Sequence, residues 1–269
     1  MPHLTVNGTT YFYTVEGEGP ETLVLGHGLL LTHRLWDAQV AALRDRYRCV
    51  RFDWRGQGRS AVPPLGYDPW VLAADVLRLA DALGTRRFHY AGHGMGGHVG
   101  LRVALRAPER VATLVLVGSG AAAASDAERA CARLIGLGAR TLGLRAVLPR
   151  LAPYYFGPRL RKDAARHADH AAARRLLTSS TRTGALRATR ALLARDDLRG
   201  RLRALAQPVL ILAGELDALH PPAEARGLAA RLPHAELTVL SETGHTPPLE
   251  RPQTTSRLLT DFLGRRPIR

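Results

Sequence analysis

An acid and a histidine stand late in the chain, each directly after an expected strand. Asp217 follows the apolar run at 208–213, and His245 follows the run at 236–240. Because open parallel sheets place their active sites at the carboxyl ends of strands, both side chains are expected at one edge. A carboxylate that holds one ring nitrogen of a histidine fixes the tautomer and makes the other nitrogen a stronger base. The pair Asp217 and His245 is therefore predicted to act as a general base.

A glycine-rich turn precedes this pair along the chain. The run Ala91-Gly92-His93-Gly94-Met95-Gly96-Gly97 lies between an expected strand at 88–91 and an expected helix at 96–106. Such a strand-to-helix turn needs flanking glycines because it is sharp, and its central residue sits at positive φ. The turn aims the central side chain into the site, where covalent attack requires Ser, Cys or Asp. Position 94 is glycine, so the turn of a nucleophile elbow is present without a nucleophile.

Two loops are predicted to donate backbone amides to a developing oxyanion. The amide of Met95 follows the centre of the elbow and points at the carbonyl oxygen under attack. The loop His27-Gly28-Leu29-Leu30 follows an early core strand, and its Leu29 amide is the expected second donor. The segment from Asp53 to Ser60 also follows a strand. It has the punctuation of a tight loop held together by its own Asp and Arg, and we interpret it as structural.

The elements that must position these groups alternate along most of the chain. An Asn7-Gly8 turn predicts a β-hairpin over 4–15. Strands are expected at 22–25, 49–52, 88–91, 113–117, 208–213 and 236–240, and helices at 35–46, 69–83, 96–106, 222–232 and 252–263. This alternation indicates an α/β fold with a parallel sheet covered on both faces. From 121 to 205 only helical Ala/Leu/Arg segments occur, which predicts a helical cap (121–205) inserted into a core (1–120 and 206–269).

With the elbow, the acid and the histidine in that chain order, the sequence resembles the α/β-hydrolase superfamily over essentially its whole length. It is most similar to cap-bearing esterases, C–C bond hydrolases and related lyases with a Gly-His-Ser-Met-Gly-Gly elbow. The resemblance implies a mostly parallel eight-stranded sheet with helices on both faces and a helical cap between the sixth and seventh strands. It assigns the acid to Asp217, the histidine to His245 and the oxyanion amides to Leu29 and Met95. The nucleophile maps to Gly94, where the pattern fails.

Three functional hypotheses follow from glycine at position 94. In the first, an enzyme works without a covalent intermediate: His245 removes a proton from substrate or water while the two amides stabilise an enolate or alkoxide. A cyclase, lyase, isomerase, decarboxylase or direct attack by water would fit, with natural-product biosynthesis as one setting. In the second, the chain is a serine hydrolase whose nucleophile was replaced. In the third, it is a non-catalytic small-molecule binder or receptor. The retained Asp217 and His245 favour the first.

The substrate pocket is expected to be mainly apolar or aromatic, which favours a small apolar carbonyl compound. The candidate lining residues lie near the elbow, at strand ends and in the most aromatic stretch of the cap: Leu30, Trp36, His93, Ser119, Tyr154, Tyr155 and Phe156. No His, Cys, Asp or Glu residues stand at metal-ligand spacing, and the glycine run does not match a dinucleotide fingerprint. The sequence therefore predicts neither a metal nor a cofactor.

Composition limits the partners that we expect. The formal net charge is +15, carried almost entirely by scattered arginines, and no nucleic-acid motif accompanies them. The two cysteines form no disulfide framework, and neither a signal peptide nor a long apolar span is visible. We therefore expect a cytoplasmic monomer or homodimer that binds a small-molecule substrate, with neither nucleic acid nor a membrane as partner.

Overall fold

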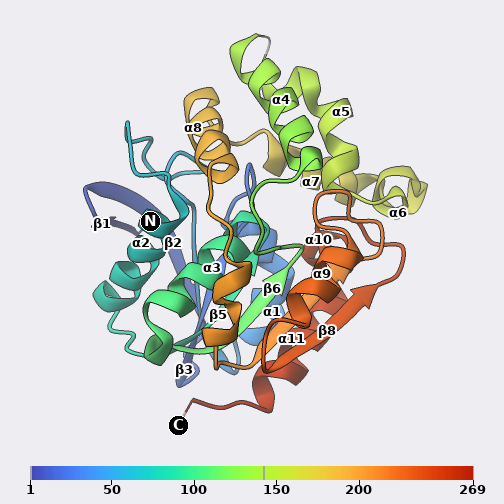
Figure 1. Cartoon of the computed structure of the whole chain (residues 1–269). Coiled ribbons are helices and arrows are strands. Elements are labelled where there is room, and N and C mark those ends of the chain that lie inside the picture. The colour runs from blue at the N-terminus through green and yellow to red at the C-terminus, as the bar shows by residue number, and fades with distance from the viewer. Residues whose placement is uncertain (1, 142, 269) are drawn as a thin grey trace.

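The computed structural model describes residues 2–141 and 143–268. Its centre is one sheet of eight strands (Figure 1). In chain order these are β1 (His3–Val6), β2 (Thr9–Glu16), β3 (Glu21–Gly26), β4 (Tyr47–Phe52), β5 (Phe88–His93), β6 (Val111–Val117), β7 (Val209–Gly214) and β8 (Ala235–Leu240). Their order across the sheet is β1-β2-β4-β3-β5-β6-β7-β8. Only β2 runs antiparallel to its neighbours β1 and β4, which confirms the predicted mostly parallel sheet.

The first two strands form the predicted hairpin. Asn7 and Gly8 have φ values of 45° and 66°, which are the left-handed values that both central residues of a type I′ turn require. The turn brings β2 back antiparallel to β1, and β2 then pairs with β4. The hairpin therefore closes one edge of the sheet, and the parallel strands behind it carry the elbow.

Helices cover both faces because successive residues of a strand point to opposite sides. In β3, Leu23 and Leu25 join one hydrophobic core with α1 and α11, whereas Val24 joins a second core with α2, α3 and α9. The core helices are α1 (Asp37–Leu43), α2 (Pro69–Ala82), α3 (Met95–Arg106), α9 (Pro222–Ala229), α10 (Pro247–Glu250) and α11 (Pro252–Gly264), with 3₁₀ turns η1 (His33–Trp36) and η2 (Pro108–Arg110). The helix expected at 35–46 is shorter, because its first part is the 3₁₀ turn that Thr32 caps.

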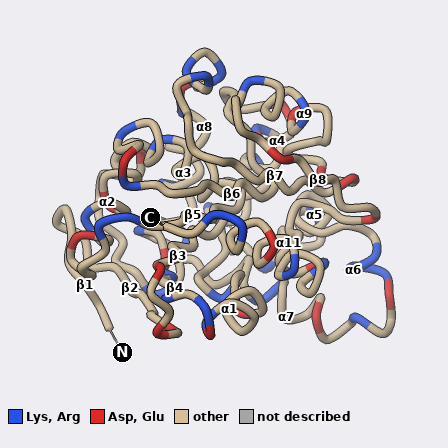
Figure 2. Tube along the Cα trace, turned by 90° about the horizontal axis from the view of Figure 1, so that it is seen from below, with Lys and Arg blue, Asp and Glu red and all other residues tan. Residues whose placement is uncertain are grey.

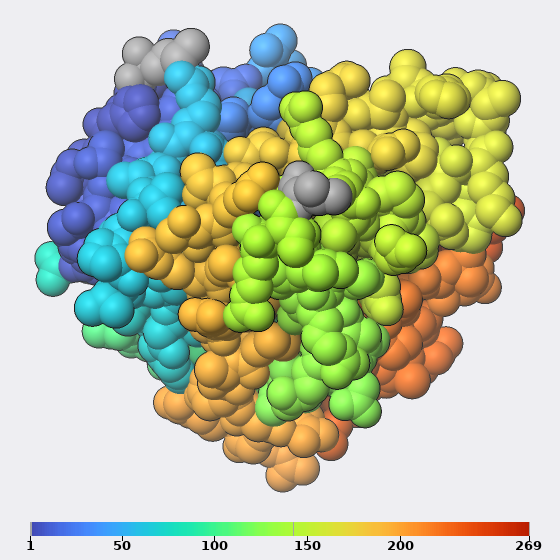
Figure 3. Space-filling view, turned by 90° about the horizontal axis from the view of Figure 1, so that it is seen from above, coloured from blue at the N-terminus to red at the C-terminus, as the bar shows by residue number. Residues whose placement is uncertain are grey.

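Between β6 and β7 the described residues form helices and turns but no strand. The helices are α4 (Asp126–Arg140), α5 (Leu144–Tyr155), α6 (Pro158–Lys162), α7 (His167–Leu177) and α8 (Arg182–Leu193), with 3₁₀ turns η3 (Ala164–Arg166) and η4 (Arg199–Ala204). They lie over the carboxyl edge of the sheet and cover much of the molecule when it is seen from above (Figures 1 and 3). The segment predicted as a cap, 121–205, contains all of them. That they form a domain of their own stays a prediction.

The loop from Asp53 to Ser60 is held together by its own contacts. The Asp53 carboxylate accepts from the amides of His33 at 2.7 Å and Arg59 at 2.9 Å. The Ser60 hydroxyl donates to the Asp53 carbonyl oxygen at 2.5 Å. These contacts agree with the structural interpretation of the loop.

Charged residues are distributed over the whole fold. Lys and Arg residues lie along the trace with Asp and Glu among them (Figure 2). In residues 2–141 and 143–268, no helix has both the length and the apolar character needed to cross a bilayer.

Candidate active site

The predicted elbow lies where β5 ends and α3 begins. Gly94 has φ 49° and ψ −113°, a combination that residues with a Cβ rarely adopt. The turn is tight on both sides. An added Cβ at Gly92 would lie 2.4 Å from the carbonyl carbon of Gly96, and one at Gly96 would lie 2.3 Å from the carbonyl oxygen of Gly26. The elbow therefore needs its glycines, and the residue at its apex, Gly94, carries no side chain.

His245 faces this apex. A Cβ built on Gly94 would lie 3.2 Å from Nε2 of His245. On the other side of the ring, Nδ1 donates to Oδ2 of Asp217 at 3.0 Å. The second carboxylate oxygen, Oδ1, accepts from the amides of Leu219 at 2.8 Å and His220 at 3.0 Å. The two residues assigned as acid and histidine thus meet beside the elbow, and both are buried.

The Asp217 carboxylate is held in its ionised form. Burial by itself raises the pKa of Asp217, but the charge and hydrogen bond of His245 and the neighbouring His220 bring that pKa below its usual value. An ionised carboxylate keeps the ring proton on Nδ1 of His245. Nε2 therefore has the lone pair that a general base needs, and this lone pair faces Gly94.

A buried carboxylate fixes the loop that carries His245. Oε2 of Glu250 accepts from the amides of Gly157 at 2.8 Å and Gly244 at 2.9 Å. Oε1 of Glu250 accepts from the amide of Thr246 at 3.0 Å and from its hydroxyl at 3.1 Å. Because Gly157 belongs to the helical segment, this carboxylate ties that segment to the histidine loop. Glu250 is thus a positioning residue, and the sequence analysis did not single it out.

Two backbone amides beside the elbow have no hydrogen-bond acceptor in the described parts of the chain: those of Leu29 and Met95. Met95 is the first residue of α3, where an amide has no acceptor within the helix. Leu29 lies in the loop after β3, and its carbonyl oxygen accepts from the Tyr155 hydroxyl at 3.2 Å. Both residues line the same cavity as Gly94. This arrangement leaves both amides available to a substrate oxygen.

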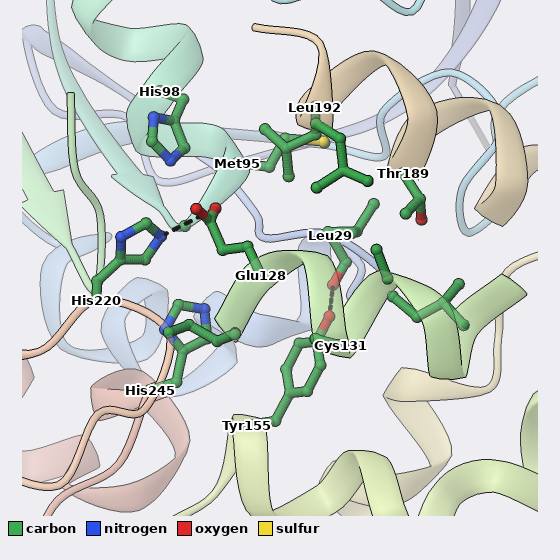
Figure 4. Close-up of a pocket in the computed structure, with 15 residues that line it drawn as sticks. Leu29, Met95, His98, Glu128, Cys131, Tyr155, Thr189, Leu192, His220 and His245 are labelled. Carbon is green, nitrogen blue, oxygen red and sulfur yellow. Dashed lines mark hydrogen bonds and ion pairs between the residues drawn. The ribbon is translucent and has the colours of Figure 1, made fainter. Parts of the chain in front are cut away.

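A small cavity joins these groups, and Figure 4 shows the side chains around it. Its volume is about 40 Å³, which is room for a few water molecules. Apolar side chains make up most of its wall: Leu29, Met95, Ile135, Leu192, Leu193 and Leu219. A cavity of this size and lining suits a small acyl group better than a bulky one.

The structure brings together part of the predicted binding set. Tyr155 lines the cavity with Leu29, Gly94, Met95 and His245. Six residues do not line it: Leu30, Trp36, His93, Ser119, Tyr154 and Phe156. Three of these are buried in the hydrophobic core, namely Leu30, Trp36 and Phe156, and Tyr154 packs against that core. These large apolar side chains therefore pack in the core near the site. The sequence pattern cannot distinguish a side chain that packs in the core from one that contacts substrate.

His93 and Ser119 support the elbow from outside the cavity. Nε2 of His93 donates to the carbonyl oxygen of His245 at 2.8 Å, and the two ring centroids lie 4.6 Å apart. Burial, followed by the nearby His245, lowers the pKa of His93 well below its usual value, so the ring is neutral. The Ser119 hydroxyl donates to the carbonyl oxygen of Gly94 at 3.0 Å. Both residues therefore hold the elbow and the histidine loop in place.

Three polar side chains that the sequence analysis did not connect form one end of the cavity. His98 comes from α3, Glu128 from α4 and His220 from the loop after β7, and they point toward one another (Figure 4). Nδ1 of His220 donates to Oε2 of Glu224 at 3.0 Å, and Nε2 lies 3.7 Å from Oε1 of Glu128. Ligand atoms of His98, Glu128 and His220 all lie within 4.8 Å of one another. Tertiary packing assembles this cluster from distant positions, which is why the spacing of residues along the chain did not indicate it.

The charges around this cluster shift its pKa values in different directions. Burial raises the pKa of Glu128, but His220 and Arg195, whose Nη2 lies 2.7 Å from Oε2, bring it below its usual value. Burial lowers the pKa of His220, but Glu224 and Glu128 raise it above its usual value. Burial, with Arg195, lowers the pKa of His98 well below its usual value. The cluster thus combines an ionised carboxylate with a neutral imidazole.

A wider groove adjoins the cavity between α4 and α8. Its volume is about 620 Å³, and it shares Ala132, Thr189 and Leu193 with the cavity wall. Four arginines line it: Arg129, Arg133, Arg140 and Arg190. Within the described ranges none of the four forms an ion pair with a carboxylate. The space next to the cavity therefore carries uncompensated positive charge.

Comparisons with known proteins place the chain among relatives of one fold. A relative from Agrobacterium fabrum, named "Putative carbamate hydrolase RutD", is 32% identical and covers 97% of each chain. The solved enol-lactonase from Burkholderia xenovorans LB400 is 29% identical with a TM-score of 0.90, covering 98% of this chain and all (100%) of its own. The solved thermophilic esterase from Thermogutta terrifontis is 26% identical with a TM-score of 0.90, covering 98% of this chain and 99% of its own. The family model for the alpha/beta hydrolase fold matches residues 21–252, and the chain therefore belongs to this family of enzymes.

Proposed function

We propose that this enzyme hydrolyses a small carbonyl compound by direct attack of water, without an acyl-enzyme intermediate. The observation that carries the proposal is the open space at Gly94. A Cβ on residue 94 would come within 3.2 Å of Nε2 of His245. With glycine at this position, the space between Cα and that nitrogen is open to a water that hydrogen-bonds to Nε2. His245, oriented by Asp217, takes the proton of this water as its oxygen attacks the carbonyl carbon.

The amides of Leu29 and Met95 complete the reaction. As the water oxygen bonds to carbon, the carbonyl oxygen becomes an oxyanion, and two amides without internal partners can stabilise it. The bond from carbon to the leaving oxygen or nitrogen then breaks, and His245 returns its proton to the leaving group. Each donor of this kind is worth roughly 10²–10³ in kcat in enzymes with an oxyanion hole. The proposal thus uses only groups present at the elbow.

The substrate class is narrowed by the comparisons and by the cavity. The similar proteins are named for carbamates, esters and an enol-lactone, and hydrolysis of each breaks a bond at a carbonyl carbon. This supports hydrolysis over the cyclase, lyase, isomerase and decarboxylase chemistries that the elbow by itself also allows. The small apolar cavity favours a short acyl group. The arginines of the adjoining groove favour a leaving part that carries a carboxylate.

The test measures hydrolysis and looks for a covalent intermediate. With p-nitrophenyl acetate and a small-lactone panel, we expect steady turnover without a nitrophenol burst and no added acyl mass on the intact protein. His245→Ala should lower kcat about 10²–10⁴-fold, the usual worth of a general base. Full activity of a folded His245→Ala variant would refute the proposal. So would a stoichiometric burst, because that requires a nucleophile on the protein.

A second candidate, a serine hydrolase whose nucleophile has been replaced, is favoured by one observation. The side chain of residue 94 would begin 3.2 Å from Nε2 of His245, which suits a hydroxyl that this nitrogen deprotonates. Gly94→Ser decides between the two. If this variant shows a burst, an acyl-enzyme and a kcat above that of the wild type, the replaced-nucleophile hypothesis is supported. If it is slower than the wild type, direct attack by water is supported.

A further inference from the structure

The polar end of the cavity brings three side chains of metal-ligating type close together. His98, Glu128 and His220 each offer one ligand atom, and these atoms lie within 4.8 Å of one another. We propose that His98, Glu128 and His220 bind one divalent transition-metal ion of the zinc class. Two imidazoles and one carboxylate are a ligand set that zinc uses in proteins with three protein ligands and an open fourth position.

The contact between His220 and Glu128 supports a cation between them. Because the Glu224 carboxylate can only accept, Nδ1 of His220 donates to it at 3.0 Å, and a neutral ring has its lone pair on Nε2. That lone pair faces Oε1 of Glu128 at 3.7 Å, which is too long for a hydrogen bond. Two ligands of a tetrahedral zinc, each about 2.1 Å from the ion, lie about 3.4 Å apart. The observed separation is close to that value.

His98 provides an independent observation. Its side chain is buried, and its Nε2 has no hydrogen-bond partner in the described parts of the chain. A buried polar atom without a partner destabilises the fold, and a ligand bound by Nε2 of His98 would remove that penalty. The ring of His98 lies 5.3 Å from that of His220, centroid to centroid, and both point to Glu128 (Figure 4). A metal ion in the cluster would give Nε2 of His98 the partner that the described protein atoms do not provide.

The surroundings have the charge and the outer contacts that a bound cation requires. Three carboxylates surround His220, namely Glu128, Glu224 and Asp217, and one guanidinium, that of Arg195, contacts Glu128. The carboxylates nearest His220 thus outnumber the guanidinium that contacts Glu128, which favours a bound cation. The contact from Glu224 to Nδ1 of His220 is also the arrangement that orients metal-binding histidines in known sites.

The open position of this site would face the cavity, because all three ligands line it together with Gly94 and His245. A water or a substrate oxygen would take that position. The metal site does not rest on the proposed hydrolysis, since binding is measurable without turnover.

The experiment is a zinc titration of tag-free, chelator-treated protein against a chromophoric competitor. We expect one zinc ion per chain with a dissociation constant below about 1 µM, and an anomalous-scattering peak at the zinc edge between the three side chains. His98→Phe and Glu128→Gln should each weaken binding at least about 100-fold, because each removes a ligand. Glu224→Gln removes only the outer contact and should weaken binding about 10–100-fold.

His234→Ala is the matched control, since His234 is an exposed histidine that is not in the cluster. It should bind zinc as the wild type does, and circular dichroism checks that every variant is folded. If either ligand variant fails to fold, Glu224→Gln and the position of the anomalous peak decide. The proposal is overturned if the wild type binds no zinc at this level, if the peak lies elsewhere, or if folded ligand variants bind like the wild type.

Discussion

Gly94→Ala tests whether the space at the elbow is used in catalysis. Gly94 has φ 49° and ψ −113°, and a residue with a Cβ in such a region is strained by about 1–3 kcal/mol. The new Cβ would lie 3.2 Å from Nε2 of His245, so the ring must move by a few tenths of an ångström. In a chain of this size, a loss of about 2 kcal/mol lowers Tm by about 4–8 °C. The variant should therefore fold, with a measurable loss of stability.

The effect on catalysis should be much larger than the effect on stability. The added methyl group projects into the space between Cα of residue 94 and Nε2 of His245, where the proposal puts the attacking water. Misplacing a reacting group by about 1 Å can reduce the rate about 10²-fold. We expect kcat for p-nitrophenyl acetate to fall by about that factor, measured well below the Tm of the variant.

Gly84→Ala supplies the matched control for backbone strain. Gly84 has φ +68° and no atom within 4 Å of an added Cβ, and it lies between α2 and β5, outside the residues that line the cavity. It should lose a comparable amount of stability with unchanged kcat. If Gly94→Ala keeps the kcat of Gly84→Ala, the space at the elbow is not used by water or substrate, and our reasoning is wrong.

Three further predictions concern stability and substrate choice. Burial raises the pKa of Asp53, but the His33 hydrogen bond and the His27 ring lower it below its usual 3.8. The ionised Asp53 carboxylate therefore stabilises the fold above about pH 4, and this stabilisation is lost as the pH falls through the lowered pKa. In urea denaturation, Asp53→Asn should lose about 1.5–3 kcal/mol at pH 7, and a gap to wild type that does not shrink below pH 4 would contradict this. Glu250→Ala leaves three amides unpaired, while the Thr246 hydroxyl keeps its bond to the Tyr155 carbonyl oxygen. This variant should cost about 3 kcal/mol in thermal unfolding and lower kcat, and an unchanged kcat would show that Glu250 does not position the histidine loop. The double variant Arg129→Ala and Arg133→Ala should raise KM for 4-acetoxybenzoate, whose leaving part carries a carboxylate, about fivefold but should not raise KM for phenyl acetate. The exposed Arg203→Ala is the control, and equal changes in KM for both esters would count against a role of the groove.

Much of the fold could be predicted because its signals are local. The Asn7-Gly8 turn, the apolar strand runs and the glycines of the elbow each act through the conformation of a few neighbouring residues. For this reason the strands, their mostly parallel sheet and the helices that cover it were expected from the pattern. The helix expected at 35–46 was too long, since a 3₁₀ turn capped by Thr32 precedes α1. Local capping decides such a boundary, and hydrophobic periodicity does not report it.

The sequence by itself determined the order of elbow, acid and histidine, and the absence of a side chain at Gly94. Only the tertiary structure decided what surrounds them. Trp36 and Phe156 lie in the core and not in the cavity wall. An apolar sequence pattern indicates that a side chain is buried, but it does not indicate which side chains or ligand it is buried against. His98, Glu128 and His220 meet only because a helix between β6 and β7 packs over the loops after the strands. Contacts between residues so far apart in the chain depend on the packing of whole elements, which no local pattern encodes.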